Sequence, residues 1–252
     1  MPFPSSSRVF SSSSLPTRPR TSYSLKISGV RLIKKTGDAK EKKGIGFLKP
    51  KGAKISMVLV IVTGVFGSGK TTVAGHFRKL GCVVLDSDKI VRGLYRKKAV
   101  QKKLAKEFGA GVIAYGKVDS RALAQKVFSD KSALKKLNHF VHPLVFSQIK
   151  KKVKRFSRKK IVVVEVPLFF ESPLANSLYP DFVVVVWAKR EKIFERLKKK
   201  GFSEKEFTLR MKTQLPLSKK KRLSDFVVDN SKSVDFTRMQ VKKFFDTISE
   251  LE

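Results

Sequence analysis

The chain has 252 residues, 41% of them hydrophobic and 10% aromatic, so it holds enough apolar material for a folded core. Its single cysteine, Cys82, excludes an intramolecular disulfide and a cysteine-rich zinc site. No apolar run approaches the roughly 18 residues of a membrane-spanning helix, so we expect a soluble protein without a membrane partner. A second feature is charge, because 56 basic residues against 20 acidic ones give +36.

A polycation binds phosphate backbones without a dedicated site. The basic residues here fall in short runs beside apolar segments, as they do on solvated faces. We therefore expect no specific nucleic-acid partner.

Residues 1–56 differ in composition from the rest of the chain. Seven of the first fourteen residues are serine, and the segment carries 13 basic residues but two acidic ones. The remainder carries 43 basic and 18 acidic residues, a charge of +25. Such a composition is typical of an organellar transit peptide, and also of an unstructured leader or a start-site artefact ahead of Met57. We expect a disordered basic leader on a cytoplasmic protein, or on an organellar one if the leader is a transit peptide.

From Met57 onward, short apolar runs alternate with helical patterns. The runs are residues 57–62 (MVLVIV), 83–85, 161–166 (IVVVEV), 182–187 (FVVVVW) and 226–228. Continuous apolar character predicts strands buried on both faces, as in a parallel sheet covered by helices. Ser203 and Glu206 form a predicted capping box at a helix start. An apolar stripe at helical spacing over residues 241–251 predicts a last helix that covers the sheet.

The first strand leads directly into residues 64–71, GVFGSGKT, which match the phosphate-loop pattern G-x-x-x-x-G-K-[ST] in full. The glycines let successive backbone N–H groups turn toward phosphate oxygens, and the following helix adds its positive N-terminal end. Lys70 supplies a charge to the β- and γ-phosphates, and the Thr71 hydroxyl is a predicted Mg²⁺ ligand. The predicted ATP-binding residues are Gly64, Gly67, Ser68, Gly69, Lys70, Thr71 and Thr72.

The second strand ends in two carboxylates, Asp86 and Asp88. This position is the edge of the sheet where open α/β proteins place their ligands. One carboxylate is expected to orient and deprotonate a hydroxyl that attacks the γ-phosphate, and the other to cap the next helix.

Several motifs in fixed order resemble the dephospho-CoA kinase family. They begin with the phosphate loop and LDSD (residues 85–88), continue through HPL (142–144) and VPLFFE (166–171), and end with DFVVDN (225–230). The likeness covers residues 57 to about 245. It implies ATP-dependent phosphorylation of the ribose 3′-hydroxyl of dephospho-CoA, which yields CoA and ADP.

The same resemblance implies a P-loop kinase fold and a set of roles. The fold would hold a five-stranded parallel sheet with helices on both faces, a helical substrate-binding insertion over residues 92–156 and a lid over residues 198–222. Asp88 matches the catalytic aspartate, Arg196 an arginine near the nucleotide phosphates, and Thr63 a threonine at the loop entry. Thr63, Asp88 and His142 are the expected substrate-binding residues. ATP, dephospho-CoA and Mg²⁺ would be the ligands of a monomer or weak homo-oligomer.

Other candidates carry two interpretations each. His142, ahead of Pro143 at a predicted helix start, either contacts substrate or is structural. Glu165 lies within an apolar strand, where a charge is costly unless paired, so it either holds Mg²⁺ or bonds a neighbour. Glu171 is expected to pin a loop to a basic residue. The run at residues 219–222 either contacts phosphates on lid closure or forms an exposed helix face.

One departure from the family concerns the lid, and two rival functions stay open. After Arg196 the family pattern gives a second arginine and an aspartate, where this chain has Lys200 and Gly201. Lysine keeps the charge but loses the bidentate fork, which predicts a looser phosphate contact. The rivals are another P-loop kinase for small molecules or nucleoside monophosphates, and a nucleic-acid-associated P-loop ATPase.

Overall fold

The computed structural model describes residues 24–27, 30–33, 57–156 and 161–250. The chain divides into two compact units, residues 1–48 and 49–252. In the first unit, β1 (Ser24–Ile27) and β2 (Val30–Ile33) pair in antiparallel fashion. Most of the predicted leader lies outside the described residues, so its disorder and its role as a transit peptide stay predictions.

Five parallel strands form the sheet of the second unit, in the order β4-β7-β3-β8-β9. They are β3 (Val58–Gly64), β4 (Val83–Asp86), β7 (Ile161–Glu165), β8 (Phe182–Trp187) and β9 (Phe226–Asp229). Each apolar run of the sequence is therefore a strand, as predicted. β3 and β7 are buried along their whole length, which explains why their sequences do not alternate.

The register of these strands brings polar residues to one edge of the sheet. Val62 of β3 lies beside Glu165, and Asp86 of β4 lies beside the same Glu165 on its other side. Because all five strands are parallel, their carboxyl ends meet at this edge.

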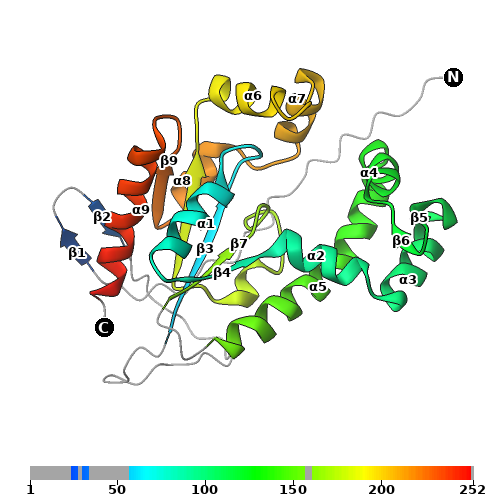
Figure 1. Ribbon diagram of the computed structural model, residues 1–252, viewed down its shortest axis with the longest axis horizontal. Coiled ribbons are helices and arrows are strands. Elements are labelled where there is room, and N and C mark those ends of the chain that lie inside the picture. The colour runs from blue at the N-terminus through cyan, green and yellow to red at the C-terminus, as the bar shows by residue number, and fades with distance from the viewer. Residues whose placement is uncertain (1–23, 28–29, 34–56, 157–160, 251–252) are drawn as a thin grey trace, which may run out of the picture. The chain divides into compact units, whose positions relative to one another are not determined.

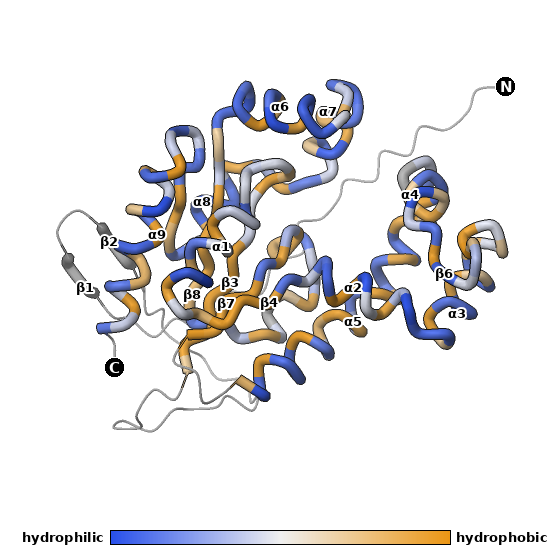
Figure 2. Tube along the Cα trace, viewed as in Figure 1, coloured by the Kyte–Doolittle hydropathy of each residue, from blue (hydrophilic) through white to orange (hydrophobic). Residues whose placement is uncertain are grey.

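Helices cover both faces of the sheet (Figure 1). On one face, α1 (Lys70–Lys79) and α9 (Val234–Ser249) bury Phe77, Phe244 and Ile248 against the strands. The predicted stripe of the last helix is confirmed up to Ile248, and Leu251 lies outside the described residues. On the other face, α5 (Lys131–Arg155) packs with the loop after β7. Figure 2 shows the strands as the hydrophobic centre between helices with hydrophilic outer residues.

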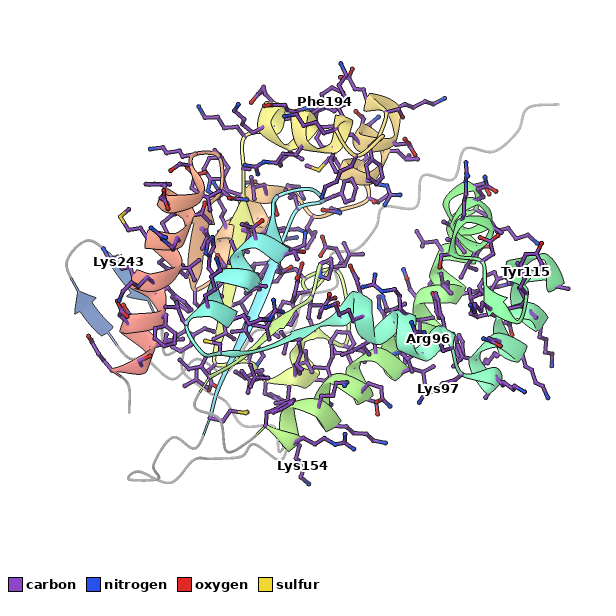
Figure 3. All side chains as sticks on the ribbon, viewed as in Figure 1. Arg96, Lys97, Tyr115, Lys154, Phe194 and Lys243 are labelled. Carbon is purple, nitrogen blue, oxygen red and sulfur yellow. The ribbon has the colours of Figure 1, made fainter. Side chains whose placement is uncertain are left out.

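A helical insertion separates β4 from β7. It contains α2 (Ser87–Tyr95), α3 (Lys98–Phe108), η1 (Ala110–Val112), β5 (Ile113–Ala114), β6 (Lys117–Val118), α4 (Ser120–Ser129) and α5. Its outer part has a core of its own, with Leu104, Val112 and Leu123 among the buried residues. Tyr115, fully exposed, lies at the outer end of this part (Figure 3).

After β7, η2 (Ala175–Leu178) leads to β8, and three helices, α6 (Arg190–Lys198), α7 (Glu204–Lys212) and α8 (Leu217–Leu223), separate β8 from β9. α6 and α7 lie side by side beyond the sheet (Figure 1), and their buried Ile193 and Phe207 share a core with Val65 of the phosphate loop. The predicted capping box is confirmed, because Ser203 Oγ accepts from Glu206 N and Glu206 Oε2 accepts from Ser203 N.

Two predictions from composition also have structural counterparts. Among the described residues, none of the helices combines the length and the apolar character needed to cross a membrane. Cys82 is buried, and burial raises the pKa of its thiol to about 11, so the thiol stays protonated at neutral pH.

Candidate active site

The phosphate loop joins β3 to α1 at the carboxyl edge of the sheet (Figure 1). Gly69 is the N-cap of α1 with φ +92°, a left-handed conformation that a side chain would strain. A Cβ at this position would also collide with the amide nitrogen of Asn230. Among the described residues no side chain caps α1, so the N–H groups of Lys70 and Thr71 at its start are left for an anion.

Lys70 is the charged centre of this loop. Its ammonium group donates to the Val65 carbonyl at 2.9 Å and lies 3.4 Å from the Gly64 carbonyl oxygen. The pKa of Lys70 is lowered to about 8, mainly by burial; Glu165 opposes this shift, and the positive charge of Lys220 contributes to it. At neutral pH the amine is therefore mostly protonated, and it rests on backbone oxygens of the loop.

A hydroxyl and a carboxylate meet next to Lys70. Thr71 Oγ1 donates to Glu165 Oε1 at 3.0 Å. Burial raises the pKa of Glu165, and the nearby charges of Asp86 and Asp88 raise it as well. A divalent cation would relieve this crowding of carboxylates.

These residues fit Mg²⁺ as a co-ligand of phosphate. Among the described residues, no group of three or more His, Cys, Asp or Glu side chains is placed to hold a metal by itself. Mg²⁺ commonly uses one or two protein oxygens together with substrate phosphates and water, and Thr71 and Glu165 offer such a pair.

The two aspartates after β4 have different surroundings. Asp86 is the N-cap of α2, and its Oδ1 accepts from the Lys89 N–H at 3.1 Å. Asp88 lies in the first turn of α2, and its carboxylate makes no hydrogen bond within the part of the chain that is described. Burial raises the pKa of the Asp88 carboxyl, and Asp86 adds to this, whereas Lys70 and Arg92 oppose it. The carboxylate of Asp88 is thus within electrostatic reach of Lys70 and free to accept a proton.

Asn230, at the end of β9, holds the loop together with Arg196 of α6. The side-chain amide of Asn230 donates to the Ser68 carbonyl at 2.9 Å, and the backbone carbonyl of Asn230 accepts from Arg196 Nη2 at 2.8 Å. Thr237 Oγ1 donates to Asn230 Oδ1 at 2.9 Å. Arg196 Nη1 and Ser68 Oγ are buried without a hydrogen-bond partner among the described residues, so both can receive a ligand oxygen.

Sequence reasoning missed Asn230 as a site residue. Its only signal was a lone amide directly after an apolar strand in the DFVVDN motif.

Thr63, Thr72 and His142 lie at the margins of this site. Thr63 is completely buried, and its hydroxyl donates to the Pro167 carbonyl at 3.2 Å. Thr72 is exposed in the first turn of α1, and its N–H donates to the Gly69 carbonyl. His142 Nδ1 lies 3.4 Å from Ser172 Oγ in the loop after β7, and burial lowers the pKa of this histidine.

The prediction of a helix start at His142 and Pro143 is wrong. Pro143 lies inside α5, which begins at Lys131. Proline is favoured in the first turn of a helix, but an apolar stripe continues across this position and holds the helix against the core.

The basic run at residues 219–222 is not simply an exposed face. Lys220 of α8 is fully buried, and its ammonium lies 2.8 Å from Glu171 Oε1. Glu171 Oε1 also accepts from the Leu215 N–H at 2.9 Å. The prediction that Glu171 pins a loop to a basic residue is confirmed.

Three comparisons place this site among known proteins. A family model described as dephospho-CoA kinase matches residues 58–235. The dephospho-CoA kinase of Aquifex aeolicus is 37% identical over 190 residues, which cover 75% of this chain and 96% of the relative. The dephospho-CoA kinase of Bacillus licheniformis is 37% identical over 202 residues, 78% of this chain and all of the relative.

Solved structures agree with these sequence relatives. The dephospho-CoA kinase from Campylobacter jejuni aligns with a TM-score of 0.58 and 25% identity, over 76% of this chain and 97% of that one. A Thermus thermophilus protein aligns with a TM-score of 0.67 and 29% identity, over 78% of this chain and 98% of that one.

Proposed function

The chain belongs to the dephospho-CoA kinase family and has that phosphotransferase activity, and we propose that Asp88, Lys70 and Arg196 carry the transfer. The observation that carries this proposal is the convergence at one sheet edge of Lys70, the Thr71–Glu165 pair and Asp88 around an uncapped helix start. Phosphoryl transfer requires positioning and charge neutralisation more than covalent help, and this set supplies both.

Asp88 acts on the acceptor. Its carboxylate takes the proton of the ribose 3′-hydroxyl while that oxygen forms a bond to the γ-phosphorus of ATP. The bond between the γ-phosphorus and the bridging oxygen breaks, and ADP leaves with the electron pair. Support comes from the absence of any other hydrogen bond to Asp88 among the described residues and from its electrostatic coupling to Lys70.

The donor side is held by the loop. Lys70 leaves its carbonyl partners for the β- and γ-phosphates, and Arg196 turns its unpartnered Nη1 to the same anion. The N–H groups of Gly67, Gly69, Lys70 and Thr71 complete the cradle with the hydroxyls of Ser68 and Thr72. The N–H groups of Ser68 and Thr72 themselves donate to the Val65 and Gly69 carbonyls. Thr71 and Glu165 would hold Mg²⁺, which, when bound, neutralises charge between the phosphates.

The acceptor and the lid lie on either side of this cradle. The helical insertion over residues 92–156 binds dephospho-CoA, with His142 as a contact. Thr63 acts indirectly, because its buried hydroxyl donates to the Pro167 carbonyl and so fixes the loop after β7. The lid over residues 198–222 contains α7 and most of α8, and its closure excludes water.

The setting of the enzyme is proposed from sequence alone. It works in the cytoplasm, or in an organelle if residues 1–56 are a transit peptide, as a monomer or weak homo-oligomer. It has no specific nucleic-acid partner.

The test is an ADP-release assay on the full chain with ATP and Mg²⁺. Dephospho-CoA is compared with a panel of nucleoside monophosphates, other small alcohols and RNA, and the position of the new phosphate is read by NMR. We expect turnover with dephospho-CoA and a 3′-phosphate product. Turnover restricted to another small acceptor would favour the rival kinase function, and stimulation by RNA would favour the rival ATPase.

The two aspartates give a matched pair of variants. Asp88→Asn is expected to lower kcat by about 10²–10⁴-fold with little change in either KM, because a general base acts in the transition state. Asp86→Asn is expected to keep near-normal kcat, because asparagine caps a helix as well as aspartate does. A large loss of kcat in Asp86→Asn alone would reverse the two roles.

A further inference from the structure

A buried ion pair lies outside the set of residues assigned above. The Lys220 side chain of α8 is fully buried, and its partner Glu171 is 16% exposed. A buried charge is costly even when paired, and replacing such a pair by apolar residues often does not harm stability. The pair therefore calls for a role beyond stabilising the fold.

Glu171 connects two parts of the chain through one oxygen. Its Oε1 accepts the backbone N–H of Leu215 and contacts the ammonium of Lys220, whereas its Oε2 is buried without a hydrogen bond among the described residues. Leu215 lies in residues 213–216, here called the hinge segment, between α7 and α8. The carboxylate thus fixes both the hinge segment and the helix that follows it to the loop after β7.

The hinge segment in turn contacts the phosphate loop. Gln214 Oε1 accepts the backbone N–H of Phe66 at 3.1 Å. In the last turn of α7, the guanidinium carbon of Arg210 lies 4.9 Å from the Phe66 ring centroid and 5.3 Å from that of Phe202. The hinge segment and the end of α7 therefore both contact the phosphate loop.

Electrostatics link the same pair to the phosphate-binding amine. The charge of Lys220 lowers the pKa of Lys70 and that of Glu171 raises it, although burial is the larger cause. Both members of the pair thus lie close enough to influence the charge that meets the nucleotide.

We propose that Glu171 and Lys220 are positioning residues for nucleotide binding. Their ion pair holds the hinge segment so that Gln214 fixes the Phe66 amide and, with it, the shape of the phosphate loop. Neither residue contacts the nucleotide in this proposal, which rests on the proposed role of the loop as the ATP site. Preorganising a loop in its binding shape raises affinity because less order is lost on binding.

The test measures ADP binding by calorimetry, beside KM values and thermal stability, on full-length variants. Glu171→Gln keeps an oxygen for the Leu215 N–H but leaves Lys220 unpaired, so it is expected to lower Tm and to weaken ADP binding. The double variant Glu171→Met with Lys220→Met removes both buried charges, so its Tm is expected to return to the wild-type range. Its ADP affinity should stay about tenfold weaker, with the KM for ATP raised alike and the KM for dephospho-CoA unchanged.

Two further variants make the outcome specific. Gln214→Ala is expected to weaken ADP binding by a similar factor, and adding it to the double variant should cause little further loss, because both changes remove the same contact. Lys242→Gln breaks an exposed ion pair with Asp246 on α9 and serves as the control with unchanged affinity. Wild-type ADP affinity in the double variant, or additive losses with Gln214→Ala, would overturn the proposal. Failure of the wild type to bind ADP would instead overturn the proposed site.

Discussion

Lys70 and the carboxylates of Asp86, Asp88 and Glu165 form one electrostatic unit at the edge of the sheet. Burial lowers the pKa of Lys70 to about 8, and raises the pKa of Asp88 and of Glu165. Each group is thus partly destabilised in its charged form until a phosphate or a cation arrives. Substrate binding would therefore shift the protonation equilibria of these groups.

ADP affinity should fall as the pH rises through about 8. The bound phosphates favour the ammonium form of Lys70, so the pKa of Lys70 in the complex lies above its value of about 8 in the free enzyme. ADP therefore binds with full affinity below pH 8 and with falling affinity above pH 8. Above pH 8, binding of ADP is accompanied by uptake of a proton by the enzyme. Calorimetry between pH 7.5 and 9.5, in two buffers of different ionisation enthalpy, measures both effects.

The control for this prediction is Lys70→Met. This variant should bind ADP weakly, with no proton uptake and a flat pH dependence between pH 7.5 and 9.5. A flat profile in the wild type would contradict the lowered pKa of Lys70.

Residues of this site differ in how far the sequence reveals them. Lys70 and Thr71 follow from a local pattern, because the loop's chemistry requires them at fixed spacing. Asn230 and Gln214 reach the phosphate loop from 162 and 148 residues away, through single hydrogen bonds. Such contacts depend on how strands and helices pack, so no local pattern could have predicted them.

At the scale of elements, α5 shows how packing overrides a helix-breaking residue. Leu137, Val141, Val145 and Ile149 continue one apolar face past Pro143 and pack into the cores of the insertion and the sheet. Strand prediction succeeded because buried parallel strands need continuous apolar runs. The predicted helix start at Pro143 is wrong because this stripe extends to the N-terminal side of the proline, and α5 begins at Lys131.

Pro143→Ala should stabilise the protein by up to about 3 kcal/mol, because proline inside a helix removes a backbone donor and crowds the preceding turn. Pro143 is exposed, so the change leaves the core intact. Urea unfolding of the full chain measures the effect. Ser147→Ala, at an exposed position on the same helix, is the control, with an expected gain of roughly 0.5 kcal/mol.

The same variant tests whether the proline shapes the acceptor site. If the course of α5 at Pro143 positions His142, the KM for dephospho-CoA should rise in Pro143→Ala while the KM for ATP stays constant. A variant no more stable than Ser147→Ala would contradict the assigned cost of the proline.

At the scale of the whole molecule, the net charge of +36 is far larger than the charge of the few cations in the candidate active site. Residues 57–252 carry +25, and residues 1–56 carry the rest. Lys70 and Lys220 are buried and committed to the site, whereas most other cations of α5 and α6 are exposed. Exposed charges at this density attract any polyanion without selecting a sequence.

RNA binding by the full chain should therefore be non-specific and strongly dependent on salt. With about five phosphates contacted, a slope of about −0.7 per phosphate predicts roughly a hundredfold loss of affinity between 50 and 200 mM salt. Fluorescence anisotropy with two unrelated 20-nucleotide RNAs should give equal affinities at each salt concentration. In 150 mM salt, added RNA should not change the rate of ADP release during turnover of dephospho-CoA. Removing residues 1–56 should lower the slope, because fewer counterions are released. Salt-resistant binding with a preference for one RNA would show a selective surface and assign the excess charge to a second partner.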